Sequence, residues 1–141
     1  MTGKVRLVEI SDQPLDVEGH LAAVRDPRAG ADVLFCGVVR DHDHTRSVLE
    51  LEYSAYPSAA EVLLEVAGEI AASEEVIAVA VSHRIGMLAI GDVALVAAVS
   101  CAHRGQAFEH CHRLVDEAKA RLPIWKRQVF ADGSDEWVNC P

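Results

Sequence analysis

The sequence has no apolar run long enough to cross a membrane and no segment typical of a secretion signal. A transmembrane helix needs about 20 consecutive apolar residues, and no stretch of the 141 residues approaches that length. The first residues, MTGKVRLVEI, carry no long hydrophobic segment behind a basic start, so we expect no signal peptide. Half of the residues are hydrophobic and a quarter are charged, which predicts a globular, cytoplasmic protein.

The sequence also lacks an excess of basic residues. Its formal net charge of −9 argues against general nucleic-acid binding, which relies on a positively charged surface. However, six of the 13 Lys and Arg residues lie between Arg104 and Arg127, against three acidic residues. This basic stretch indicates either a focused anion site or a helix with a solvated charged face, and charge alone favours the helix.

No Cys-x-x-Cys pair occurs among the four cysteines, Cys36, Cys101, Cys111 and Cys140. We expect reduced thiols, with Cys36 and Cys101 buried in apolar, strand-like runs.

Histidines cluster at two places, but neither cluster has the geometry of a metal site. His110 and His112 point well apart on a helix, and His42 and His44 lack a cysteine or carboxylate at zinc spacing. We therefore expect no structural metal and no cofactor.

Alternation and helical periodicity predict an α+β protein. Strands are predicted at Val5–Ile10, Asp32–Val39, Val48–Tyr56, Val76–Ile85, Val93–Ser100, Ile124–Phe130 and Glu136–Asn139. Helices are predicted at Pro14–Val24 (opened by Asp12), Ala59–Ala72 (capped by Ser58) and Gly105–Leu122 (stopped by Pro123). The polar segment Asp41–Ser47 predicts a mobile loop. Residues 1–141 then form one α+β domain with flanking helices.

Lys119 lies at the edge of the apolar stripe of the last predicted helix. That stripe contains Ala107, Phe108, Cys111, Leu114, Val115, Ala118 and Leu122. At about 100° per residue, Lys119 is roughly 80° from the centre of the stripe. A lysine in this position can be structural filler with a solvated amine, or it can supply an amine for proton transfer or covalent chemistry.

Lys126 follows Pro123-Ile124-Trp125, so a rigid corner and a large aromatic residue precede it. Alternation places Lys126 on the same face of its strand as Ile124 and Gln128, opposite Trp125 and Arg127. An edge-strand lysine that discourages aggregation and a functional lysine explain this pattern equally well.

Three further cationic or polar side chains stand at the ends of predicted elements. His103 and Arg104 precede the last helix, where free backbone N–H groups attract phosphate. Arg40 ends a strand after Gly37. In each case, a side chain satisfied by backbone, an acid or water is an equally good explanation.

These motifs, taken together and in order, resemble the molybdopterin synthase catalytic subunit family. The matching segments are Gly37-x-Val39-Arg40, Leu51-Glu52-Tyr53-x-Ala55-Tyr56-Pro57, His83-Arg84-Ile85-Gly86-Met87-Leu88, Gly91-Asp92, Ser100 to Arg104, Ala107-Phe108 and Ala118 to Arg127. The likeness runs from about Val5 to Trp137. Each segment is weak alone, but the ordered set is specific.

The resemblance implies an α/β hammerhead-type fold with a mixed or antiparallel sheet, and a central homodimer within a heterotetramer. A small ubiquitin-like sulfur-carrier subunit would bind at each end and insert a C-terminal thiocarboxylate. The substrate would be cyclic pyranopterin monophosphate, a pterin phosphate, converted to the molybdopterin dithiolene. No nucleic acid or membrane partner is implied.

Carried over by position, Lys119 and Lys126 match the two essential lysines of the family. The positions that match substrate-contacting residues are Val38, Val39, Arg40, His103, Arg104, Arg127 and Gln128. The sequence departs from the family at Asp41-His42-Asp43-His44 and at Ser54, which makes the loop geometry and the carrier affinity less secure.

We expect the cations to hold the phosphate and thiocarboxylate together against their mutual repulsion. Lys119 would contact the acyl end, and Lys126 would donate a proton or stabilise charge, although these roles can be exchanged. The alternatives are a regulatory domain that binds a phosphorylated metabolite, a thiol enzyme using Cys101 or Cys111, and an assembly scaffold.

Overall fold

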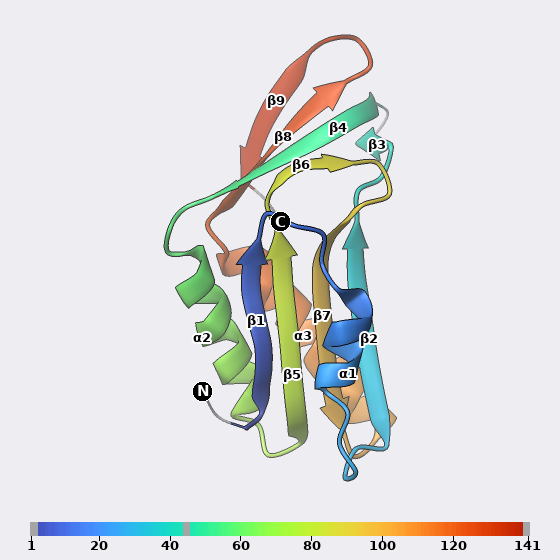
Figure 1. Cartoon of the computed structure of the whole chain (residues 1–141), viewed down its shortest axis with the longest axis vertical. Coiled ribbons are helices and arrows are strands. Elements are labelled where there is room, and N and C mark those ends of the chain that lie inside the picture. The colour runs from blue at the N-terminus through green and yellow to red at the C-terminus, as the bar shows by residue number, and fades with distance from the viewer. Residues whose placement is uncertain (1–2, 44–45, 140–141) are drawn as a thin grey trace.

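Within residues 3–43 and 46–139, the computed structural model has three α-helices and two β-sheets (Figure 1). The first sheet consists, in spatial order, of β1 (Val5–Ser11), β5 (Val76–Arg84), β7 (Val93–Cys101) and β2 (Ala31–Val38). The β1–β5 pair is parallel and the other neighbouring pairs are antiparallel, so this sheet is mixed. Val and Ala dominate β5 and β7, as expected for central strands covered on both faces.

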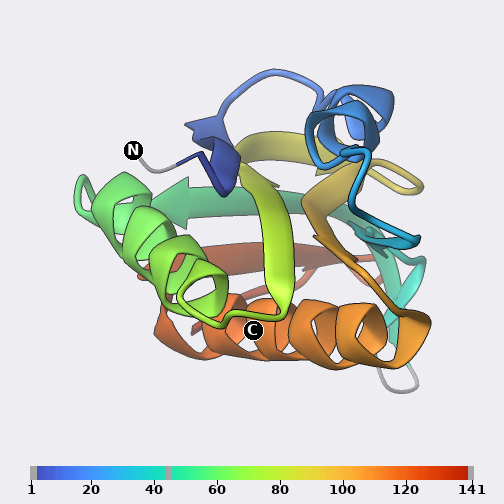
Figure 2. The same ribbon diagram turned by 90° about the horizontal axis from the view of Figure 1, so that it is seen from below.

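The helices cover the first sheet on both faces (Figure 2). α2 (Ala59–Ala71) and α3 (Arg104–Arg121) lie on one face, and α1 (Val17–Ala23) lies on the other. In α2, the fully buried Leu63, Val66 and Ile70 recur at spacings of three and four residues and therefore form one stripe against the sheet. Burial of each such side chain contributes roughly 1.5–3 kcal/mol of transfer free energy.

The second sheet lies across the end of the first sheet at which β1, β5 and β2 finish (Figure 1). Its central strand is β4 (Arg46–Ala55), which pairs antiparallel with β6 (Gly86–Ala89) on one side and β8 (Ile124–Phe130) on the other. β9 (Asp135–Asn139) pairs antiparallel with β8 at the edge of the sheet, and β3 (His42–Asp43) pairs with the start of β4.

The predicted α+β class, with a mixed sheet and flanking helices, is confirmed, and six of the predicted strands match β1, β2, β5, β7, β8 and β9 closely. None of the helices in the described part of the chain has the length and apolar character needed to cross a bilayer.

One predicted helix start was wrong, and one predicted capping hydrogen bond is absent. α1 begins at Val17 rather than near Pro14, because Asp16 and not Asp12 is its N-cap: the Asp16 carboxylate accepts a hydrogen bond from the Gly19 amide at 2.9 Å. Ser58 precedes α2 as predicted, but its side chain makes no capping hydrogen bond.

The segment predicted as a mobile loop, Asp41–Ser47, partly forms a short antiparallel pair. His42 and Asp43 oppose Ser47 and Arg46, while His44 and Thr45 lie outside the described residues. Strand β6 was also missed, because its four residues pair only with the distant β4.

Burial departs from the prediction at two places. Phe108 was assigned to the apolar stripe of α3, yet its side chain is 61% exposed, while Ala107 and Cys111 face the sheet. Strand β2 was predicted to be buried but is half-buried along most of its length, Cys36 included, because it is an edge strand of the first sheet.

Candidate active site

A cavity of about 270 Å³ lies at the junction of the two sheets, beside the C-terminal end of α3. Its walls come from the end of β2 and the residues after it, from β4, β5 and β7, from the last turn of α3, and from β8. The lining residues are Gly37, Val38, Val39, Arg40, Leu51, Tyr53, His83, Ala94, Leu95, Ala118, Lys119, Leu122, Ile124, Lys126 and Gln128. Because these segments are scattered along the sequence, the cavity depends on the complete tertiary fold.

The two predicted lysines line this cavity from neighbouring elements. α3 ends at Arg121, and the backbone turns at Leu122 and Pro123 into β8. Alternation along β8 directs Ile124, Lys126 and Gln128 to the cavity, as the sequence pattern predicts.

The cavity is cationic. Among the residues that the structure describes, Arg40, Lys119 and Lys126 are its charged lining residues, and none of the lining residues is Asp or Glu. Among the described residues, neither lysine forms an ion pair. Three positive side chains without a carboxylate around one hollow favour the binding of anions.

The neutral polar part of the wall consists of Tyr53, His83 and Gln128. Gln128 is buried, and its side-chain amide donates to Glu136 at 3.2 Å. Burial, and to a lesser degree the nearby charge of Lys119, lowers the pKa of His83 to about 4. His83 is therefore neutral near pH 7 and adds no charge to the site.

Neither Tyr53 nor His83 was predicted from the sequence to be a site residue. The signal for His83 was a histidine at the end of an apolar strand, within the His83-Arg84-Ile85-Gly86 segment.

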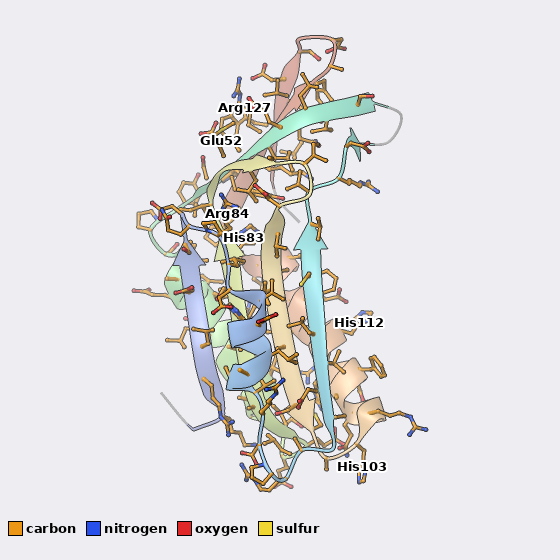
Figure 3. All side chains as sticks on the ribbon, turned by 45° about the vertical axis from the view of Figure 1, so that its right-hand side comes forward. Glu52, His83, Arg84, His103, His112 and Arg127 are labelled. Atoms are coloured by element: carbon orange, nitrogen blue, oxygen red, sulfur yellow. The ribbon has the colours of Figure 1, made fainter. Side chains whose placement is uncertain are left out.

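His103 and Arg104, predicted from the resemblance to contact substrate, do not line the cavity. Both are exposed at the N-terminal end of α3, whereas the cavity lies beside its C-terminal end. Figure 3 shows His103 at one end of the molecule and His83 at the junction of the sheets. Within one chain, His103 and Arg104 therefore lie at the opposite end of α3 from Lys119.

Arg127 is likewise directed away from the cavity. Its Nε lies 2.7 Å from Asp135 Oδ2, and its Nη1 lies 3.8 Å from Glu52 (Figure 3). The hydrogen bond to Asp135 raises the pKa of Arg127. The alternation of β8 therefore predicts the direction of the Arg127 side chain correctly, whereas the resemblance implied that Arg127 contacts substrate. The remaining substrate-contact candidates, Val38, Val39, Arg40 and Gln128, do line the cavity.

The cysteines are poorly placed for nucleophilic chemistry. None of the lining residues is a cysteine. Cys101 and Cys111 are buried, and burial raises the pKa of both thiols, that of Cys111 to about 11. Because the thiolate is the nucleophile, this environment does not support the thiol-enzyme alternative. Within residues 3–43 and 46–139, no cluster of three or more His, Cys, Asp and Glu side chains could hold a metal ion.

Fold and site together define an α+β protein with a cationic cavity that is lined by the side-chain amines of Lys119 and Lys126. A family profile described as "MoaE protein" matches residues 10–121. The molybdopterin synthase catalytic subunit 1 of Mycobacterium tuberculosis is 41% identical over 130 residues, which cover 92% of this chain and 88% of the relative. The crystal structure of molybdopterin synthase from Staphylococcus aureus superposes with a TM-score of 0.85 at 31% identity and covers 98% of each chain.

The chain belongs to the MoaE family, as the resemblance predicted. The fold alone is also shared with a chain of the protein–protein complex of subunits 1 and 2 of molybdopterin-converting factor from Helicobacter pylori, at 21% identity and a TM-score of 0.72. That match covers 94% of this chain and 88% of the other.

Proposed function

We propose that this chain is the catalytic subunit of a molybdopterin synthase. It would transfer sulfur from the C-terminal thiocarboxylate of a small ubiquitin-like carrier subunit to cyclic pyranopterin monophosphate, forming the dithiolene of molybdopterin. The observation that carries the proposal is that Lys119, Lys126 and Arg40 line one cavity, to which the described part of the chain contributes no Asp or Glu. The relatives named as molybdopterin synthase catalytic subunits support it.

The charge of the cavity suits this reaction, because both reactants are anionic and would otherwise repel each other. Arg40 would hold one anionic group through its bidentate guanidinium. Lys119 would contact the acyl end of the carrier, and Lys126 would donate a proton or stabilise charge as the cyclic phosphate opens. The sulfur belongs to the carrier, so no cysteine of this chain needs to be a nucleophile.

The proposal includes the assembly and location inferred from the resemblance: a homodimer with one carrier bound per chain, in the cytoplasm. Because His103 and Arg104 lie away from the cavity of their own chain, any contact they make with substrate requires a second copy of the chain. Free thiols at Cys36, Cys101 and Cys111 fit a reducing compartment.

The direct test supplies the purified protein with thiocarboxylated carrier and the cyclic pterin, and measures the dithiolene product by mass spectrometry. We expect product in amounts that follow the supplied thiocarboxylate. Binding of the pterin without turnover would instead identify a non-catalytic domain that binds a phosphorylated metabolite.

A further inference from the structure

The Gly91-Asp92 motif belongs to the turn between β6 and β7, and the proposed mechanism does not use it. The turn runs from Ala89 to Asp92, and the Asp92 amide donates to the Ala89 carbonyl at 3.0 Å. Gly91, the third residue of the turn, has a φ of 91°, as in a type II turn, which strains other residues. Because β6 belongs to the second sheet and β7 to the first, the turn joins the two sheets.

The Asp92 carboxylate closes this turn a second time. Its Oδ2 atom accepts a hydrogen bond from the Ala89 amide at 2.9 Å, so two reciprocal hydrogen bonds join Ala89 and Asp92. The same oxygen lies 3.4 Å from Nη1 of Arg84, a mostly buried side chain at the end of β5 (Figure 3). The conformation of the turn therefore depends on the Asp92 side chain as well as on Gly91.

The backbone of the turn holds the chain just after β2 (Figure 1). The Val39 amide donates to the Asp92 carbonyl at 2.9 Å, and the Gly91 amide donates to the Val39 carbonyl at 2.8 Å. β2 itself ends at Val38, after an irregularity in its pairing with β7. The turn between β6 and β7 therefore fixes the backbone where the ladder of β2 stops.

The residue after Val39 is Arg40, which supplies the guanidinium of the cavity wall. The Val39 carbonyl and the Arg40 nitrogen belong to one planar peptide unit, so the hydrogen bond from Gly91 fixes the plane from which the Arg40 side chain departs. Val39 is buried whereas Arg40 is exposed. An exposed arginine has many rotamers, and a fixed backbone limits the positions that its guanidinium can reach.

We propose that Asp92 is a positioning residue for Arg40: by closing the turn, its carboxylate places the Arg40 guanidinium where it binds the phosphate of the substrate. A guanidinium binds phosphate through two parallel hydrogen bonds, so its direction matters as well as its charge. Asp92 does not line the cavity, and its effect on substrate passes through the backbone of Val39. The inference rests on the proposed function.

Two substitutions of Asp92 test the closure of the turn. Asp92→Ala removes the acceptor for the Ala89 amide, whereas Asp92→Asn keeps an amide oxygen at that place. We expect Asp92→Ala to raise KM for the cyclic pterin about fivefold or more, with a smaller change in kcat, and Asp92→Asn to stay within about twofold of the wild type. A wild-type KM in Asp92→Ala, or equal losses in both variants, contradicts the proposal.

Gly91→Ala disturbs the same turn without removing a polar group. An added Cβ meets no atom within 4 Å, so the effect comes from the positive φ alone. Gly133→Ala is the matched control, because Gly133 has a φ of 88°, equally open surroundings and a place between β8 and β9, outside the cavity. KM for the pterin should rise in Gly91→Ala and not in Gly133→Ala; equal values in the two variants contradict the proposal.

A double-mutant cycle with Arg40→Ala separates positioning from a general loss of stability. Once the guanidinium is absent, its placement no longer matters, so adding Asp92→Ala to Arg40→Ala should change KM for the pterin by less than about twofold. A further rise as large as that in the single variant overturns the proposal.

Two measurements do not depend on turnover. Amide hydrogen exchange at Val39 and Gly91 should become about fivefold faster or more in Asp92→Ala, with β7 unchanged. Inorganic phosphate, titrated by NMR, should bind Asp92→Ala about fivefold more weakly than the wild type, and no more weakly than Arg40→Ala. Unchanged exchange at Val39, or unchanged phosphate binding, excludes the positioning role. If the wild-type protein forms no product, the proposed function fails, yet these two measurements still decide whether Asp92 acts through Arg40.

Discussion

Lys119, in the last turn of α3, and Lys126, the third residue of β8, line the same cavity although Pro123 reverses the chain between them. The two lysines are close in sequence, and the corner between them lets both side chains reach the same cavity. The placement of both amines in one site follows from one helix end, one proline and the alternation of one strand.

Replacement of Lys119 is expected to stop the reaction without preventing carrier binding. Lys119→Ala should lower product formation by about 100-fold or more, because the acyl end loses its cationic contact. Calorimetric titration with the carrier should give a dissociation constant close to that of the wild type. Arg28→Ala is the matched control: it removes one positive charge from an exposed side chain that pairs with Asp26 and does not line the cavity. Full turnover in Lys119→Ala would remove this lysine from the mechanism.

Lys126 and Arg127 are adjacent in β8 and face opposite ways, so they form a natural comparison. Lys126→Ala should lower kcat by about 100-fold, whereas Arg127→Ala should cost less than about tenfold, because Arg127 is held by Asp135 outside the cavity. Steady-state kinetics of the two variants tests the assignment. A larger loss in Arg127→Ala would show that the resemblance, and not the alternation of β8, identifies the substrate contacts.

Mixed dimers test whether His103 serves the cavity of another copy. Neither Lys119→Ala nor His103→Ala should be active alone. After equal amounts of the two variants are mixed and exchange chains, about half of the dimers should be hybrids, and each hybrid has one intact site out of two. About a quarter of the wild-type activity should therefore return. If native mass spectrometry shows hybrid dimers in the mixture and activity still does not return, His103 has no role across a dimer.

Stability should decrease in acid because of His83. The unfolded chain binds a proton at this residue below pH 6.5, but the folded chain binds it only near pH 4. Unfolding therefore becomes more favourable as the pH falls through this range, by up to about 3 kcal/mol from this residue. Urea unfolding from pH 7 to pH 4.5 measures the effect. His83→Gln, which cannot titrate, should show a shallower loss than the wild type; parallel curves would assign the acid sensitivity to other groups.

The thiols should be dispensable. Cys111 lies against the first sheet with a pKa raised to about 11, so little thiolate exists at neutral pH. Cys111→Ala should keep kcat within about twofold of the wild type, and the native protein should retain its turnover after treatment with iodoacetamide. Inactivation by the reagent, matched by loss of activity in Cys111→Ala, would revive the thiol-enzyme alternative.

Local patterns in the sequence predicted the parts of the fold and site that depend on neighbouring residues. The end of α3 at Pro123 and the facing of Lys126 and Gln128 needed only a helix breaker and a period of two. Strand β6 and the place of His83 in the cavity wall, against Tyr53, depend on β4, whose residues are far away in sequence, so no local pattern contains them. Phe108 illustrates a similar limit: helical periodicity defines an apolar sector, but which edge of the sector meets the sheet is decided by packing.

The wide distribution of the cavity wall along the chain has a consequence for folding. The wall extends from Gly37 to Gln128, and its second-sheet portion requires the pairing of β4 with β8, some 75 residues apart. Contacts between such distant segments are slow to form because a long loop must close first. During refolding, catalytic competence should therefore return after the far-ultraviolet signal of the helices, so an early collapsed species would have most of its secondary structure and no sulfur-transfer activity.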